Sequence, residues 1–204
     1  AEDGLPVPER VELARAIAAG ADGAAGEPEL SRAAAAADLA GLLARFQVPS
    51  GFLCVEHPFE AYGLQAAAYR AGVPFTAHPM FGHDIIYTHP MNRGAAIGRA
   101  AERDFLSFTD SVSRLEGGVY LSVGSAVMSP MIFEKALSMA RNVALQDGGN
   151  ITGHRIAVVD LAKSTWDWTR GEPPEDHPDY YHRFNKSFSR MGGTLRYLSL
   201  DNRD

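Results

Sequence analysis

The chain has little of several features that would assign a protein to a class quickly. It holds a single cysteine, Cys54, so no internal disulfide can form, and nothing requires an oxidising compartment. Because Cys54 lies in the apolar run GFLCV, we expect a buried, unreactive thiol. No apolar run approaches the roughly 18 residues of a membrane-spanning helix. We therefore expect a cytoplasmic protein.

Positive charge is scarce and scattered. The 204 residues carry 19 Lys and Arg against 25 Asp and Glu, a net charge of −6, and the basic residues form no run or stripe. Nucleic acids and anionic membranes attract proteins through such clusters. We therefore expect neither nucleic acid nor a membrane as a partner.

Several sequence motifs of known chemistry are absent. The chain lacks GxGxxG and GxxxxGK[ST], which argues against a typical dehydrogenase and against a P-loop NTPase. It also lacks HExxH and any cysteine pair, the stronger signatures of a metal site. Ser125, in VGSAV, is not the nucleophile of a GxSxG elbow.

What the sequence does contain is an alternation of short apolar runs with longer amphipathic segments. We expect helices over residues 9–25, 29–46, 60–71, 95–115, 125–145 and 180–191. We expect strands over residues 52–55, 73–77, 119–123, 156–161 and 194–200. This order predicts an α/β fold, a Rossmann-like parallel sheet with helices on both faces.

The same pattern sets the expected domain organisation. Residues 1–50 form a helical segment that packs on an α/β nucleotide-binding domain of residues 51–204, giving one structural domain overall. Because the sequence begins at Ala1 without a methionine, we expect the natural protein to extend beyond both ends.

The richest stretch is residues 72–90, GVPFTAHPMFGHDIIYTHP, at a predicted strand-to-loop junction, where open α/β sheets bind ligands. Asp84 precedes an apolar pair and needs a donor or a cation, such as an amine or a ribose hydroxyl; helix capping is the alternative. The histidines His78, His83 and His89 suit substrate or catalytic contacts, turn caps or, with Asp84, a metal. Their spacing matches no strong metal pattern, so we expect no metal.

A second junction, residues 117–127, has Gly124 and Ser125 between a predicted strand and a helix. Small residues let the backbone approach a phosphate, and the helix directs its positive end there. This favours a nucleotide or another anionic ligand, although many such turns bind nothing.

The loop of residues 163–190 gathers aromatic, acidic and basic side chains. Trp166 and Trp168 are suited to enclosing a cationic or planar ligand, or to a subunit contact. Lys186 is a candidate nucleophile toward an imine or carbonyl if burial lowers its pKa; otherwise it is a solvated lysine.

Over residues 60–204 the order of these motifs resembles the deoxyhypusine synthase family and its bacterial relatives. The matching segments are Val73-Pro74-Phe75, Gly82-His83-Asp84-Ile85-Ile86, Leu121–Ser125, the strand Ile156–Asp160, Arg183-Phe184-Asn185-Lys186 and Asp201. The family's paired histidines after the glycine-rich turn are replaced here by Met128-Ser129-Pro130.

The resemblance implies an NAD-binding fold and an NAD-dependent transferase, or a related amine-handling enzyme, acting on a polyamine or similar amine. In that case Lys186 takes up the transferred group, Asp84 binds the ammonium, and His83 and His78 lie beside it. Gly124, Ser125 and Asp201 contact NAD, and Trp166 and Trp168 contact the substrate. The resemblance also implies a homo-oligomer, a tetramer or a dimer.

Two alternatives remain open at this point. One is a non-catalytic nucleotide- or ligand-binding protein of the same fold, which the missing paired histidines suggest. The weaker one is a metal-dependent hydrolase that uses His78, His83, Asp84 and His89.

Overall fold

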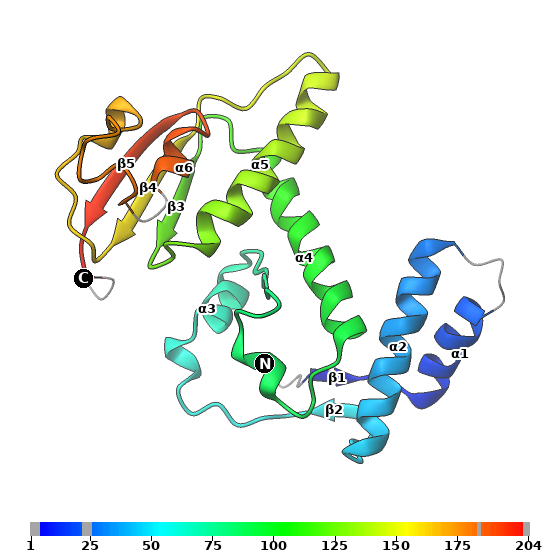
Figure 1. Cartoon of the computed structure of the whole chain (residues 1–204). Coiled ribbons are helices and arrows are strands. Elements are labelled where there is room, and N and C mark those ends of the chain that lie inside the picture. The colour runs from blue at the N-terminus through cyan, green and yellow to red at the C-terminus, as the bar shows by residue number, and fades with distance from the viewer. Residues whose placement is uncertain (1–4, 22–25, 183–184, 202–204) are drawn as a thin grey trace. The chain divides into compact units, whose positions relative to one another are not determined.

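A computed structural model describes residues 5–21, 26–182 and 185–201 of the chain. Its backbone contacts divide it into two units, Ala1–Phe105 and Leu106–Asp204, and the division falls within helix α4 (Gly94–Ser113) (Figure 1). The expected boundary at residue 50 stays a prediction. No helix in the described ranges is both long enough and apolar enough to span a bilayer.

Unit 1 begins with a two-stranded antiparallel ladder and a helix pair. Strand β1 (Leu5–Val7) pairs with β2 (Gly51–Leu53), and α1 (Arg10–Ala21) packs on α2 (Glu27–Arg45). Both helices were expected, although residues 22–25 of the first lie outside the described ranges. The strand expected at residues 52–55 corresponds to β2. Its expected place in the parallel sheet is wrong, because it pairs with β1, a strand that was not predicted. Cys54 is exposed, so the expectation of a buried thiol is also wrong.

The helix pair has its own small core. Leu13, Ala36 and Leu43 are buried there, and seven partly buried apolar residues pack around them. Gly20 permits the close approach of α1 and α2, because a Cβ at this position would lie 2.2 Å from the Cβ of Ala33. The alanine-rich sequence of α2 therefore serves close helix packing.

The remainder of unit 1 is short helices and loops. It contains η1 (Glu60–Tyr62), α3 (Leu64–Ala71) and η2 (Ile85–Thr88). Gly72 ends α3 in the left-handed region at φ 65°, as its predicted role as a C-cap requires. The strand predicted at residues 73–77 is not formed: Pro74 has no N–H, and the amide of Ala77 donates to Asp104.

Unit 2 contains a three-stranded parallel sheet in the order β3-β4-β5, with strands Val119–Val123, Arg155–Asp160 and Thr194–Ser199. Helix α5 (Met128–Gln146) connects the first two strands, and η3 (Trp168–Arg170) and α6 (Asn185–Ser189) lie between the last two. These strands and α5 confirm the prediction of an α/β pattern with a parallel sheet. Helix α6 is shorter than expected.

Both helices that follow strands cover the same face of this sheet. Tyr120, on β3, stacks on Phe133 of α5 with ring centroids 3.9 Å apart, and lies 6.1 Å from Phe188 of α6. The strand order explains this, because two right-handed crossovers that step in the same direction put their helices on one side. On the other face, Val119 and Leu121 are 56% and 59% exposed. Among the described elements of unit 2, helices therefore cover one face of the sheet, whereas helices on both faces had been expected.

Candidate functional site

The strongest candidate site is a cavity of about 400 Å³ in unit 1. It lies between the loop that follows α3 and the first half of α4. The residues that line it are Ala77, His78, Pro79, Asp84, Ile86, Ile97, Ala100, Ala101 and Asp104. They include two carboxylates and an imidazole on an otherwise apolar wall, and no Lys or Arg. Pockets that bind small molecules have this composition, mostly apolar with a few convergent polar groups.

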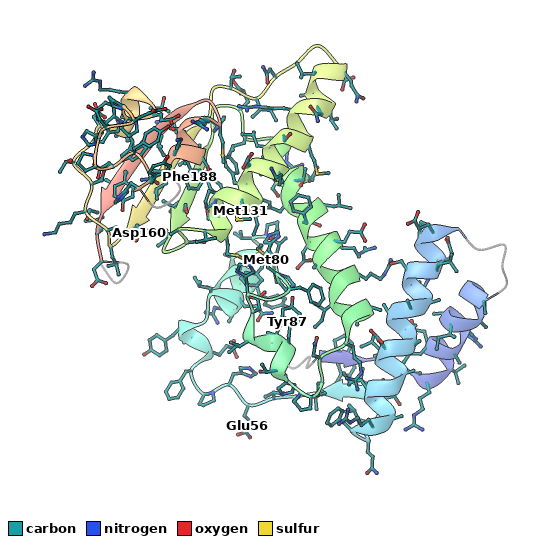
Figure 2. All side chains as sticks on the ribbon, in the orientation of Figure 1. Glu56, Met80, Tyr87, Met131, Asp160 and Phe188 are labelled. Carbon is teal, nitrogen blue, oxygen red and sulfur yellow. The ribbon has the colours of Figure 1, made fainter. Side chains whose placement is uncertain are left out.

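Backbone hydrogen bonds fix the position of both carboxylates. The amide of Met80 donates to Oδ2 of Asp84, and the amide of Ala77 donates to Oδ2 of Asp104 over 2.8 Å. In Figure 2 the labels of Met80 and Tyr87 mark this segment, because Asp84 lies between these two residues in the chain. Among the described residues, neither Oδ1 atom accepts a hydrogen bond from the protein. Each carboxylate is thus held by one oxygen and keeps the other for a ligand.

His78 is the third polar group of this cavity. Its Nε2 lies 2.9 Å from Oγ1 of Thr76, and its ring meets that of Phe105 edge-on. Burial lowers the pKa of His78, and the neighbouring Asp104 opposes this effect without cancelling it. The imidazole is therefore neutral at pH 7, and the two carboxylates leave the cavity negatively charged.

The other histidines of this segment do not join the cavity wall. The His83 side chain is exposed, and its amide donates to the carbonyl of Met80. His89 is also exposed, and its Nδ1 accepts from the amide of Met91. Within residues 5–21, 26–182 and 185–201, no three metal-ligating side chains lie close enough to hold an ion. The geometry therefore gives no support to a metal-dependent hydrolase.

The predicted NAD contacts lie at the carboxyl ends of the parallel strands in unit 2. Gly124 follows β3 and Asp201 follows β5, so the fold brings them to one edge of the sheet. The amide of Gly124, however, donates to Val159, and Oγ of Ser125 accepts from the amide of Ser129, at the start of α5. Both groups are therefore engaged in hydrogen bonds within the fold.

The fold around that edge does not match a dinucleotide site either. The strand order does not reverse, so the sheet lacks the switch-point crevice where such ligands bind. Three cavities among the described residues of unit 2 are lined by residues other than Gly124, Ser125 and Asp201. The described residues at this edge of the sheet do not build a site that fits NAD, and they support no step through it.

Lys186, the predicted nucleophile, is the second residue of the short helix α6. Its Nζ lies 3.1 Å from Oε1 of Glu172 and 3.5 Å from the centre of the Tyr180 ring. The contact with Tyr180 and the ion pair with Glu172 raise the pKa of Lys186 and outweigh the lowering effect of burial. The condition set for a nucleophilic Lys186, a pKa lowered by burial, is therefore not met. Arg183 and Phe184, from the same motif, lie outside the described residues.

The two tryptophans belong to a loop that is organised by Asp179. Its Oδ2 accepts hydrogen bonds from the amides of Thr165 and Trp166, at 2.8 and 2.9 Å, and from the hydroxyls of Ser164 and Thr165. Trp168 is 2% exposed, and its indole N–H donates to Ser164. Trp166 is more accessible and lines two open cavities. Asp179 and Trp168 thus hold the loop together, while Trp166 remains a candidate contact.

The structure places the predicted residues in two groups. His78 and Asp84 share the unit 1 cavity, whereas Lys186, Trp166, Trp168, Gly124, Ser125 and Asp201 belong to unit 2. That these groups act together stays a prediction. Asp104 was not predicted as a site residue. A signal was present, because Asp104 follows Ala101, Ala100 and Ile97 by three, four and seven residues, the spacing of one helix face.

Comparisons with protein-family models, with curated proteins and with solved structures find no match to this chain. The assignment of function therefore depends on the geometry of the site.

Proposed function

We propose that the protein binds a small aliphatic amine in the unit 1 cavity, with its ammonium group between the carboxylates of Asp84 and Asp104. The single observation that carries this proposal is the presence of two fixed carboxylates in an apolar cavity whose wall holds no cation. An alkylammonium ion has the matching chemistry, a positive head with hydrogen-bond donors and an apolar chain.

The energetics favour a cationic ligand over a neutral one. An ammonium group can donate charge-assisted hydrogen bonds to both carboxylates, whereas a neutral ligand cannot. Charge-assisted hydrogen bonds of this kind contribute about 1.5–3 kcal/mol each. Ile86 and Ile97 supply apolar contacts for the carbon chain, at about 0.8 kcal/mol per buried methylene.

The test is calorimetric titration with butylamine and with butane-1,4-diamine, with 1-butanol as the neutral control. Asp104→Asn keeps an acceptor for the amide of Ala77 but removes the charge, so we expect amine affinity to fall by about tenfold or more. Asp110→Asn, which removes an exposed charge from the same helix, is the matched control and leaves the affinity unchanged. Equal affinities of the two variants, or equal binding of butanol, would refute the proposal.

Catalysis stays a further proposal. NAD-dependent transfer, implied by the resemblance to deoxyhypusine synthase, needs a cofactor site that the described residues of unit 2 do not build, and a neutral amine that Lys186 does not supply. Amine binding without chemistry is the simpler account. A Rossmann-like arrangement, a homo-oligomer and a cytoplasmic location stay predictions.

A further inference from the structure

Unit 1 contains a second cavity of a different character, between α1, α2 and the first half of α4. Its volume is about 360 Å³. The apolar residues that line it are Pro8, Leu13, Ala16, Ala35, Ala36, Leu39, Ala96 and Ala100. Leu13, Ala35 and Ala36 are buried, so this apolar surface is continuous with the core of the helix pair.

The charged residues around this cavity are mainly arginines. Arg32, Arg99 and Arg103 line it against a single acid, Glu12. Arg99 donates to Oγ of Ser31 over 3.2 Å. Arg32 and Arg103 make no hydrogen bond or ion pair with any described residue. Two guanidinium groups with all of their donors available thus flank an apolar surface.

Helix α4 separates this cavity from the one that contains Asp84 and Asp104. Ala96, Arg99, Ala100 and Arg103 face the second cavity, at helical spacings of three, four and seven. The residues that follow each of these by one position, Ile97, Ala100, Ala101 and Asp104, face the first cavity. The two faces of one helix therefore present opposite charges, and the ligand of the second cavity must differ in sign from an amine.

Side-chain hydrogen bonds tie α4 to α2 beside the second cavity. Oδ2 of Asp38, on α2, accepts from the amides of Ala95 and Ala96 in the first turn of α4, at 2.7 and 3.2 Å. A carboxylate at this position also interacts favourably with the helix dipole. With the bond from Arg99 to Ser31, these contacts link α4 to α2 along the wall of the cavity.

We propose that this second cavity binds a small amphiphilic anion, an acid head group on a short aliphatic chain. Guanidinium groups bind carboxylates and phosphates through paired, charge-assisted hydrogen bonds. The alanine and leucine side chains match the aliphatic part, and the volume is in the range of small-molecule sites. This inference does not depend on amine binding in the first cavity.

The experiment is titration of the full chain with octanoate. Affinity should rise about fourfold for each added methylene from hexanoate to octanoate, as expected when each buried methylene contributes. Octanol should bind far more weakly. Octyl phosphate serves as the second probe: tighter binding than octanoate identifies a phosphate head group, and weaker binding identifies a carboxylate.

Charge variants test the role of the arginines. Arg103→Gln should weaken octanoate binding about tenfold or more, whereas Arg114→Gln, an exposed arginine that pairs with Asp110, should leave it unchanged. Asp104→Asn should not weaken octanoate binding, which separates this result from the amine titration. Equal binding by Arg103→Gln and Arg114→Gln, or equal affinity for octanol and octanoate, would overturn the proposal.

A steric variant provides an independent arm. Ala96→Leu places a larger side chain in the cavity wall and should abolish octanoate binding. Ala34→Leu makes the same change at an exposed position of α2 and should preserve it. Circular dichroism of both variants verifies folding, and undiminished binding by folded Ala96→Leu would contradict the assignment.

Discussion

The Nζ atom of Lys186 lies 3.1 Å from Oε1 of Glu172, so this lysine is held as a cation. Glu172 also accepts two hydrogen bonds from Arg190, at 2.7 and 2.8 Å. The Glu172 carboxylate therefore pairs with two cations, Lys186 and Arg190, and the ring of Tyr180 lies against the ammonium group of Lys186. The arrangement stabilises charge on Lys186 rather than nucleophilicity.

We predict that Lys186 titrates above its ordinary pKa of 10.5 and that Glu172→Gln lowers this pKa. The reason is that the variant removes the ion pair but keeps the contact with Tyr180. Titration of isotope-labelled lysine side chains by NMR measures the change, and Glu134→Gln, which removes an exposed acid that pairs with Lys135, is the control. A pKa of Lys186 below 10.5 in the unaltered protein, or a ready reaction of Lys186 with aldehydes at pH 7, would contradict this prediction and support a nucleophilic role.

The second prediction concerns the loop held by Asp179. Asp179→Ala leaves the amides of Thr165 and Trp166 without their acceptor, so we expect a loss of about 3 kcal/mol in the free energy of unfolding. Asp167→Ala, in the same loop, removes only a local cap on Thr169 and should cost about 1 kcal/mol. Urea unfolding of both variants gives the comparison, and equal losses would show that Asp179 does not organise the loop.

The Asp179 carboxylate should also make the free energy of unfolding sensitive to acid. Burial by itself raises the pKa of Asp179, but the hydrogen bonds from Thr165, Trp166 and Ser164 outweigh it, and the pKa is lowered from 3.8. A carboxyl group with a lowered folded pKa contributes stability above its unfolded pKa, and this is lost as the pH falls toward the folded value. We expect the stability difference between the unaltered protein and Asp179→Ala to shrink below about pH 4.

A third prediction concerns His154, which is 1% exposed and whose two ring nitrogens have no hydrogen-bond partner among the described residues. Burial lowers its pKa, Arg141 lowers it further, and Glu116 opposes both. The folded state therefore holds the imidazole neutral, and stability decreases as the pH falls below 6.5, where the unfolded chain takes up the proton. His154→Leu should reduce this decrease in unfolding measurements from pH 7.5 to pH 5, and the lowered pKa of His78 accounts for part of what is left. An unchanged pH profile would contradict the explanation.

A fourth prediction separates steric conflict from backbone strain. Gly193 has φ 71°, and a Cβ there would lie 2.2 Å from the carbonyl oxygen of His154. Gly148 has φ 73° with open space around it. We expect Gly148→Ala to cost about 1 kcal/mol through strain alone, and Gly193→Ala to cost about 3 kcal/mol or more because β4 and β5 must also move apart. Thermal unfolding of both variants measures the difference.

Much of unit 2 could be predicted because its signals are local. Residues 119–123, 156–161 and 194–200 are short apolar runs separated by helical patterns, and such an alternation specifies parallel pairing. The pairing of β2 could not be predicted, because its partner β1 is a three-residue strand followed by proline. The apolar run at residues 73–77 was mistaken for a strand, since composition does not reveal whether a neighbouring strand exists to accept its hydrogen bonds.

The site shows the same limit. Asp84 and His78 were recognised because they lie together in one unusual loop, and they do line one cavity. Asp104 comes from a helix 20 residues further along the chain, and only the packing of that helix on the loop makes it part of the site. The direction of the pKa shift of Lys186 could not be predicted from the sequence, because Glu172 and Tyr180 are brought to it by the fold of the loop and not by spacing.

The most direct test of the account is an NMR titration with butane-1,4-diamine that follows the backbone amides of Ala77 and Met80. These amides donate to Asp104 and Asp84, so a bound ammonium must change their chemical shifts. We predict that both amide signals shift and saturate with one dissociation constant. Asp84→Asn and Asp104→Asn should each raise this dissociation constant. Shifts confined to exposed carboxylates such as Asp110, growing without saturation, would contradict the proposed site.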